Sequence, residues 1–576
     1  MLTHGALHRL AIDRPPVSRA FEFRSLTRAI IPTNRHLAHK EGAGTKTVLI
    51  MQSIVKSLGH MWVCPGGYMK RIDIPARACY DIVGEMGSIK RETLDGTKWA
   101  MINKCVMQPV NFVYFMVLAR MITPGEMGVL GLTGLFFALA NSLKEAGFGA
   151  ALIRKQNRTE VDCSTVFWFN IAANVFMGSI FWLAAPWFAV FFNVPDLTWI
   201  TRISCIMMVL GATQSVHYTL YTAKRNFKTP TIIGICTSLS GMPVTLYLAY
   251  TGWSYWSMVI SGVFTGLVGL IVIWIVSPWK PRFVFSGKSF KEFFSFGYKL
   301  SLSSTVWTVY NEIINFVIGK FYSPSQLALY NRANHLAQLP ATTMLDPLSS
   351  IMFPILSTIQ DDDDRLREVY RKYLRVYLLL MYWIMFTIAA SAESVILVLY
   401  GHSWLACSSY LQILCLGYMV TPLLRVNNSY LWVKGCSGLL LRREINVRSV
   451  GIVLMCGGAY WGVSAVCWMF VAANFYNLII TLRYSVPILR ISVREQVRDL
   501  IPYAVLAALV NIPAYVVSLV LPPGYVGAFC GPLFALVAYV LILHYRKDDM
   551  YALLRDTLWE SRVMAILRSS FRTGVR

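Results

Sequence analysis

Long apolar runs follow one another from residue 98 to residue 544, and short turns or basic connections separate them. A run of about 20 apolar residues has the length of a helix that crosses the hydrocarbon core of a bilayer. Candidate spans lie near 98–120, 125–143, 164–192, 198–222, 230–250, 255–276, 297–319, 326–357, 374–399, 405–433, 445–461, 463–482, 500–520 and 526–544. The pattern predicts an all-α membrane protein with about 14 transmembrane helices.

The charged residues give these spans an orientation. The basic connections are KEAGFGAALIRKQNR, AKRNFK, WKPRFVFSGKSFK, RLREVYRKYLR, KGCSGLLLRRE and RYSVPILRISVREQVR. They alternate with short turns almost free of Lys and Arg: NVPDLT, TGWS, YGHSW and VLPPGY. Because cytoplasmic loops carry the excess of Lys and Arg, the basic connections and both termini are expected in the cytoplasm. Topology therefore explains the net charge of +24, and no nucleic-acid partner is expected.

One stretch of the chain occurs twice. LARMITPGEMGVL (118–130) corresponds to IGKFYSPSQLALY (318–330), so that Arg120 and Pro124 match Lys320 and Pro324. PWFAVFFNVPDL (186–197) has a looser counterpart in ESVILVLYGHSWL (393–405). These matches predict two parallel six-helix repeats. Parallel repeats are typical of transporters that bind substrate between their halves and alternate access to the two sides.

The chain divides accordingly into five predicted segments. The first, 1–85, is basic and irregular, and the change of composition at Met86 favours a gene-model extension before it, with a cytoplasmic tail as the alternative. The other segments are the N-lobe 86–280, the C-lobe 281–485, two further spans in 486–545, and a basic cytoplasmic tail 546–576.

Several stretches resemble a known family. GTKWAMINKCVMQPVNFVYFMVLARMITPGEMGVLGL, GFGAALIRKQNRTEVDCSTVFWFNI, FFSFGYKLSLSS and LYGHSWLACSSYLQIL are similar to bacterial polysaccharide-transporter flippases, the Wzx-like lipopolysaccharide and O-antigen flippases of the MATE/flippase superfamily. The resemblance implies a V-shaped MATE/MurJ-like transporter of two six-helix lobes in the bacterial inner membrane. It implies as cargo an oligosaccharide on undecaprenyl diphosphate. Membrane lipids and the polymerase or glycosyltransferase of the same pathway are the other implied partners.

A diphosphate cargo requires cations inside the membrane, where an ionisable residue suggests a function by default. Arg332 and Arg425 are the first candidates because the planar guanidinium binds two phosphate oxygens at once, and Lys104 is the third. Glu312 and Asp346 are candidates for ion coupling or charge pairing, and a Glu312–Arg332 ion pair is an alternative to cargo binding by Arg332.

Other ionisable residues are interpreted structurally. Arg120 and Arg202 lie near the membrane boundary, where long cationic side chains reach water. His217 and His335 are interpreted as polar residues packed between helices. The 12 cysteines show no ligand spacing and DDDDR (361–365) lacks the glycine of a calcium loop, so no metal or cofactor is expected.

Three other functions remain as alternatives. A cation-coupled MATE-type antiporter of small molecules would need a buried acid in the N-lobe, and the predicted spans there contain none at depth. A membrane-embedded polysaccharide polymerase or ligase would need a large periplasmic loop with catalytic residues, whereas these loops are short. A membrane scaffold would not need cations within its spans.

Overall fold

The computed structural model describes residues 61–63, 70–72, 76–134, 138, 148–520, 524–552 and 555. Residues 1–97 and 98–576 form two compact units. In the first unit, β1 (Met61–Val63) pairs antiparallel with β2 (Lys70–Ile72), and the long helix α4 (Ala76–Met121) begins. All other described elements are helical, which confirms the all-α prediction, and every contact discussed below lies within residues 98–576.

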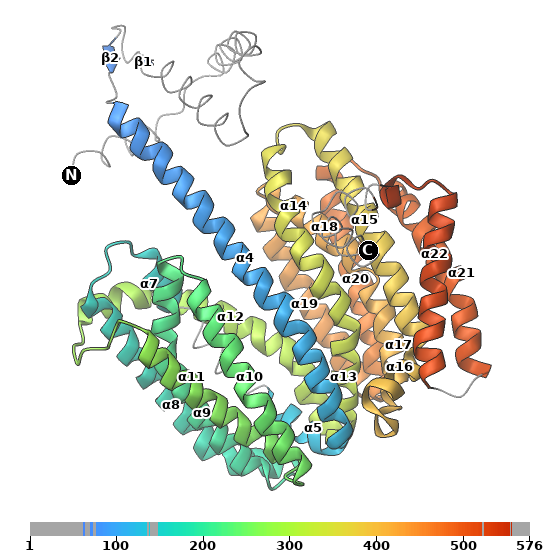
Figure 1. The fold of residues 1–576 in the computed structure, drawn as a ribbon, viewed down its shortest axis with the longest axis horizontal. Helices are drawn as coiled ribbons and strands as arrows, with labels where there is room; N and C mark the ends of the chain where they lie inside the picture. The colour runs from blue at the N-terminus through green and yellow to red at the C-terminus, as the bar shows by residue number, and fades with distance from the viewer. Residues whose placement is uncertain are drawn as a thin grey trace, which may run out of the picture. The chain divides into compact units, whose positions relative to one another are not determined.

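Among the described residues, the first half of this unit contains the C-terminal part of α4 and six further helices: α5 (Pro124–Leu132), α7 (Phe148–Arg154), α8 (Glu160–Phe192), α9 (Leu197–Ala223), α10 (Lys228–Tyr250) and α11 (Trp256–Val276). α8 packs along α9, α10 packs along α11, and α9 also contacts α11 (Figure 1). Short polar motifs set the ends of these helices. Thr159 accepts from the Asp162 backbone at 3.2 Å and Asp162 accepts from the Thr159 backbone at 2.9 Å, a capping box that starts α8.

The second half continues with α12 (Gly287–Phe321), α13 (Pro324–Pro340), the π-helical turn η3 (Ala341–Leu345), α14 (Asp346–Thr358), α15 (Asp363–Ala390), α16 (Ala392–Tyr400), the 3₁₀ turn η4 (His402–Trp404), α17 (Cys407–Tyr418), α18 (Thr421–Val433), α19 (Ser437–Gly458) and α20 (Val463–Leu489). The chain then forms α21 (Val493–Val520), the π-helical turn η5 (Val526–Cys530) and α22 (Gly531–Tyr545). α21 packs against both α22 and α15. The irregular eighth span is thus α13 and α14 joined by η3, as expected where a proline removes a helical hydrogen bond.

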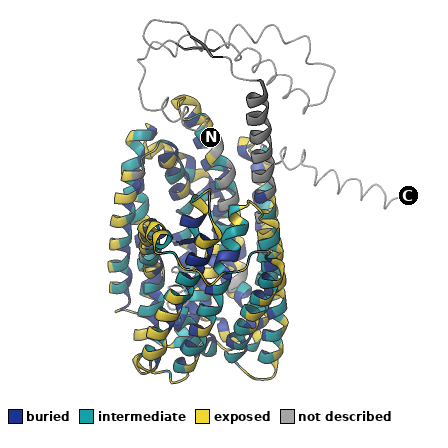
Figure 2. Cartoon of the chain, turned by 90° about the vertical axis from the view of Figure 1, so that its left-hand side faces the viewer, coloured by how far each residue is buried: buried dark blue, intermediate teal, exposed yellow. Residues whose placement is uncertain are grey.

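Ten of the described helices are long and apolar enough, by length and composition, to cross a membrane. The predicted spans missing from these ten are the second, part of which lies outside the described residues, and those formed by α12, α13 with α14, and α19. The count of fourteen stays a prediction. Large apolar side chains such as Leu183 (76% exposed) and Ile275 (77% exposed) are exposed on these helices, as expected of side chains that lipid contacts. Exposed positions recur along the helices (Figure 2).

The repeated stretch forms two helical hairpins of the same design. Thr123 and Ser323 have extended backbones and accept hydrogen bonds from the backbone three residues on, and Pro124 and Pro324 occupy the first helical positions. Proline suits that position because its missing N–H would have no helical partner. We call the side of the unit that carries both turns the hairpin end.

The two hairpins also pack against each other, α5 on α13 (Figure 1). Gly128 allows this approach, since a Cβ atom there would lie 1.8 Å from the carbonyl oxygen of Pro324. Leu118, Ile318 and Leu327 are fully buried in the core around this contact.

Replacing Gly128 with alanine is therefore expected to destabilise the hairpin contact. Overpacking a close contact costs about 1–3 kcal/mol, and the better helix propensity of alanine offsets up to about 1 kcal/mol, so we expect a net loss of about 1–2 kcal/mol. Thermal unfolding of the detergent-purified protein measures the loss. Gly125→Ala is the matched control, because nothing lies within 4 Å of a Cβ atom at Gly125. Equal stability of the two variants would contradict the tight contact at Gly128.

Candidate transport site

A pocket of about 190 Å³ lies where α4, α13 and α16 meet. α4 contributes four residues spaced along one helix face, α13 contributes three, and α16 contributes its last residue. The lining residues are Gln108, Asn111, Phe112, Phe115, Arg332, His335, Leu339 and Tyr400. The pocket thus joins helices from both predicted repeats.

Arg332 is the cation of this pocket and it is half-buried. Its guanidinium carbon lies 4.7 Å from the ring centroid of Phe115 and 5.8 Å from that of Tyr400. Stacking of this kind holds a cation in place and leaves the edge of its fork open to other partners. One terminal nitrogen lies 2.9 Å from the sulfur of Met127, which is a weak acceptor.

The structure describes the side chain of one of the two predicted acids. Glu312, half-buried on α12, accepts a hydrogen bond from the Asn315 amide at 2.8 Å, and among the described residues no ion pair joins it to Arg332. The side chain of Asp346 lies outside the described residues, although its backbone begins α14.

The other predicted cations do not line the pocket. Lys104 is exposed on α4, one turn before Gln108 on the same helix face, and Arg425 is exposed on α18. His335 is exposed and does line the pocket, one turn after Arg332. His217 is fully buried as expected of a packed polar residue, and its Nδ1 lies 2.8 Å from the hydroxyl of Ser277.

The hairpin cations both contact the ends of other helices. Lys320 donates to the carbonyl oxygen of Phe191 at 2.6 Å, and Arg120 donates to the carbonyl oxygens of Val398 and Leu399. Arg120 was expected to reach water at the membrane boundary. It is exposed, but its guanidinium is also engaged in these two hydrogen bonds.

One helix is longer than its predicted membrane span. The sequence interpretation assigned Arg443 to a basic connection and placed the eleventh span near 445–461, whereas the helix α19 begins at Ser437. Arg443 is 3% exposed and donates to the side chains of Asn428 and Glu444, while Arg448 lies over the ring of Tyr310, 4.5 Å from its centroid. The three charged residues of LRRE concealed the start of this helix, because hydropathy gives no signal for a membrane span there.

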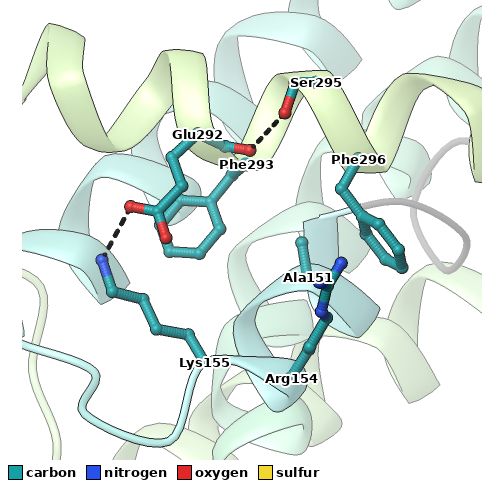
Figure 3. A pocket seen from close by; sticks show the side chains of 7 residues that line it. All are labelled: Ala151, Arg154, Lys155, Glu292, Phe293, Ser295 and Phe296. Atoms are coloured by element: carbon teal, nitrogen blue, oxygen red, sulfur yellow. Dashed lines mark hydrogen bonds and ion pairs between the residues drawn. The ribbon is translucent and has the colours of Figure 1, made fainter. Parts of the chain in front are cut away.

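A second cavity, of about 290 Å³, lies between α7 and α12 (Figure 3). Lys155 forms ion pairs there with Glu292 at 3.0 Å and Asp162 at 3.1 Å. Burial alone would lower the pKa of Lys155, but its bonds to Glu292 and Asp162 outweigh burial and raise that pKa. Because the carboxylates already neutralise Lys155, this cavity is less suited to an anionic cargo than the pocket of Arg332.

Comparison with known proteins identifies the family. The family model for polysaccharide biosynthesis proteins matches residues 117–409. The chain belongs to this family. Its resemblance to polysaccharide-transporter flippases is thereby confirmed.

Two curated relatives cover most of the chain. The teichuronic acid biosynthesis protein TuaB of Bacillus subtilis is 24% identical over 437 residues, which are 75% of this chain and 90% of TuaB. The lipopolysaccharide biosynthesis protein WzxC of Escherichia coli is 21% identical over 440 residues, 75% of this chain and 88% of WzxC.

Solved structures place the fold. The lipid II flippase MurJ, in an inward closed conformation, superimposes with a TM-score of 0.65 at 12% identity, covering 79% of this chain and 99% of MurJ. An inward-facing multidrug-resistance MATE transporter gives a TM-score of 0.52 at 14% identity, covering 66% of this chain and 94% of that one. At these identities the likeness concerns the fold, and it confirms the predicted MATE/MurJ-like architecture.

Proposed function

We propose that this protein is a flippase for an oligosaccharide linked to undecaprenyl diphosphate. It moves this intermediate from the cytoplasmic to the periplasmic leaflet of the bacterial inner membrane for lipopolysaccharide, capsule or exopolysaccharide synthesis. The observation that carries the proposal is Arg332, a stacked cation without an ion-paired acid among the described residues, at the junction of the two repeats in a chain of this family.

The pocket offers the groups that such a cargo requires. Arg332 can present two parallel N–H groups to phosphate oxygens, which form stronger bonds than the sulfur of Met127. Gln108 and Asn111 line the same pocket and can exchange hydrogen bonds with sugar hydroxyls. The polyprenyl chain stays in the lipid outside, so the protein has to surround only the polar head.

Alternating access follows from the two repeats. In this proposal residues 86–280 and 281–485 move as lobes, the hairpin end faces the periplasm, and both termini lie in the cytoplasm. Arg425 and Lys104 are further cargo contacts in other states of the cycle. Glu312 is the first candidate for binding a coupling cation, and Asp346 is the second.

The test is complementation of a strain that lacks its polysaccharide flippase. We expect the full chain to restore surface polymer and to remove the accumulated lipid-linked intermediate, both measured at matched expression. The strain should carry the native pathway, so that the cargo is the one this protein recognises. Undiminished intermediate, together with transport of small cations by purified protein in vesicles, would instead support a MATE-type antiporter.

A further inference from the structure

At the hairpin end, two cationic side chains donate hydrogen bonds to the C-terminal carbonyls of helices in the opposite repeat. Lys320 ends the first helix of the second repeat and contacts α8 of the first repeat. Its Nζ lies 2.6 Å from the carbonyl oxygen of Phe191 and 3.9 Å from the centroid of the Phe191 ring. Asn193, which follows α8 with φ 57°, donates to the carbonyl oxygens of Ala189 and Val190. Lys320 therefore donates to one of the terminal carbonyls to which the backbone N–H of Asn193 does not donate.

Arg120 makes the reciprocal contact. It ends the first described span of the first repeat and donates to Val398 and Leu399, near the end of α16 in the second repeat. Gly401, which follows α16 with φ 90°, donates to the carbonyl oxygen of Leu397. Arg120 thus satisfies the next two carbonyls of the same helix end.

The two capped helix ends are counterparts in the repeat. α8 and α16 end in the stretches 186–197 and 393–405 that the sequence pairs, and each end is followed by a residue of positive φ. Each repeat therefore supplies one cation and one helix C-terminus, and the contacts cross between the repeats twice. Such reciprocity is what a two-fold related pair of lobes produces when the two lobes meet at one end.

The Arg120 cap also adjoins the transport pocket. Tyr400, whose ring lies near Arg332, is the residue after Leu399. The indole of Trp404, just beyond, donates to the carbonyl oxygen of Ala119 at 2.8 Å, next to Arg120. Arg332 and Tyr400 both belong to the second repeat, so if this helix end left α4 the two would move together and Arg332 would lose its contact with Phe115 on α4.

We propose that Arg120 and Lys320 form a two-part latch that closes the periplasmic side of the flippase, an inference that rests on the proposed function. Both cations are exposed, so each cap favours the closed state by a factor of roughly two to five. A latch of that strength shifts the equilibrium towards the closed state and still allows the protein to open during a transport cycle.

Cysteine labelling tests the latch without cargo. The reporter is Leu327→Cys in a variant whose 12 native cysteines are replaced. Leu327 is fully buried, and its side chain packs 3.1 Å from the position of a Cβ atom at Gly131, in the contact between the hairpins. The measurement is the rate of reaction with a membrane-impermeant maleimide in right-side-out vesicles. We expect Arg120→Gln with Lys320→Gln to raise this rate about tenfold, and each single change to raise it about threefold.

Matched variants separate the latch from general effects of charge. The exchange Arg120→Lys with Lys320→Arg should keep the parental rate, since either cation can cap a carbonyl. Lys224→Gln with Lys288→Gln removes the same charge from exposed positions outside the hairpins and should also keep it. A second reporter, Ala507→Cys on the buried face of α21, detects loosening of the whole fold.

Two results would overturn the latch. One is a rate in the double glutamine variant within twofold of the parent. The other is an equal rise at both reporters, which would indicate general destabilisation. Labelling needs no cargo. A failed complementation experiment would therefore reject the proposed function, and the labelling rates could still be interpreted.

Discussion

Replacement of Arg332 with glutamine is expected to reduce polymer export at least about a hundredfold and to trap lipid-linked intermediate in the cytoplasmic leaflet. Glutamine removes the charge and the two-pronged donor, and it keeps a polar side chain in the pocket. Charge-assisted hydrogen bonds contribute about 1.5–3 kcal/mol each, so the loss of two corresponds to a factor of at least about 100. Surface polymer and extracted intermediate, quantified at matched expression in the complemented strain, give the result.

Arg202 provides the control for the Arg332 prediction. Its guanidinium also lies between two aromatic rings, 5.3 Å from Trp182 and 5.2 Å from Trp199, but outside the pocket. Arg202→Gln is therefore expected to leave export unchanged, and Arg332→Lys should restore part of it, since lysine keeps the charge without the fork. Wild-type export by Arg332→Gln would remove Arg332 from the site.

The helices were largely predictable because hydropathy reports burial in lipid directly. The hairpin turns were predictable too, since Thr123 and Ser323 act through contacts only three residues away. The charged first turns of α19 were not predictable from hydropathy, because Arg443 is buried and bonded to its tertiary partner Asn428. Local sequence cannot reveal such a partner.

The site was predictable only in its cation. A charge within an apolar span is costly, and this makes Arg332 a candidate from the sequence. Its neighbours Phe115 and Tyr400 are aromatic residues among many, and they approach Arg332 from helices remote in sequence. The same argument also selected Arg425 and Lys104, which the structure does not bring to the pocket. The sequence shows which charges lie within apolar spans, but only the packing of the helices shows which groups each charge contacts.

A second large effect is expected away from the pocket, at Asp499 on α21. The carboxylate of Asp499 is 4% exposed and accepts from two arginines of α15. Arg371 donates to its two oxygens at 2.8 Å each, and Arg375 donates at 2.6 and 3.1 Å to one of them. This network holds α21 against α15 of the second repeat, and α22 packs on α21.

Asp499→Leu is expected to lower the free energy of unfolding by about 3 kcal/mol. This value is at the low end of the cost of breaking a buried ion pair, because each arginine is about a third exposed and keeps part of its hydration. The variant leaves two guanidinium groups side by side without their anion. Thermal unfolding in detergent measures the loss. Glu368→Gln, which breaks the exposed pair with Lys372, is the control and should change stability by less than about 1 kcal/mol.

A compensated variant tests whether the lost pairing is the cause. Asp499→Leu combined with Arg371→Met and Arg375→Met removes the unpaired charges and replaces the network with apolar contacts. Buried ion pairs can be replaced in this way with little net loss, so most of the stability should return. If the triple variant were as unstable as Asp499→Leu alone, packing at this position and not the uncompensated charge would hold α21 in place. Restored stability would mean that the polar network can be exchanged for apolar contacts, and that the single variant fails because it leaves two cations without an anion.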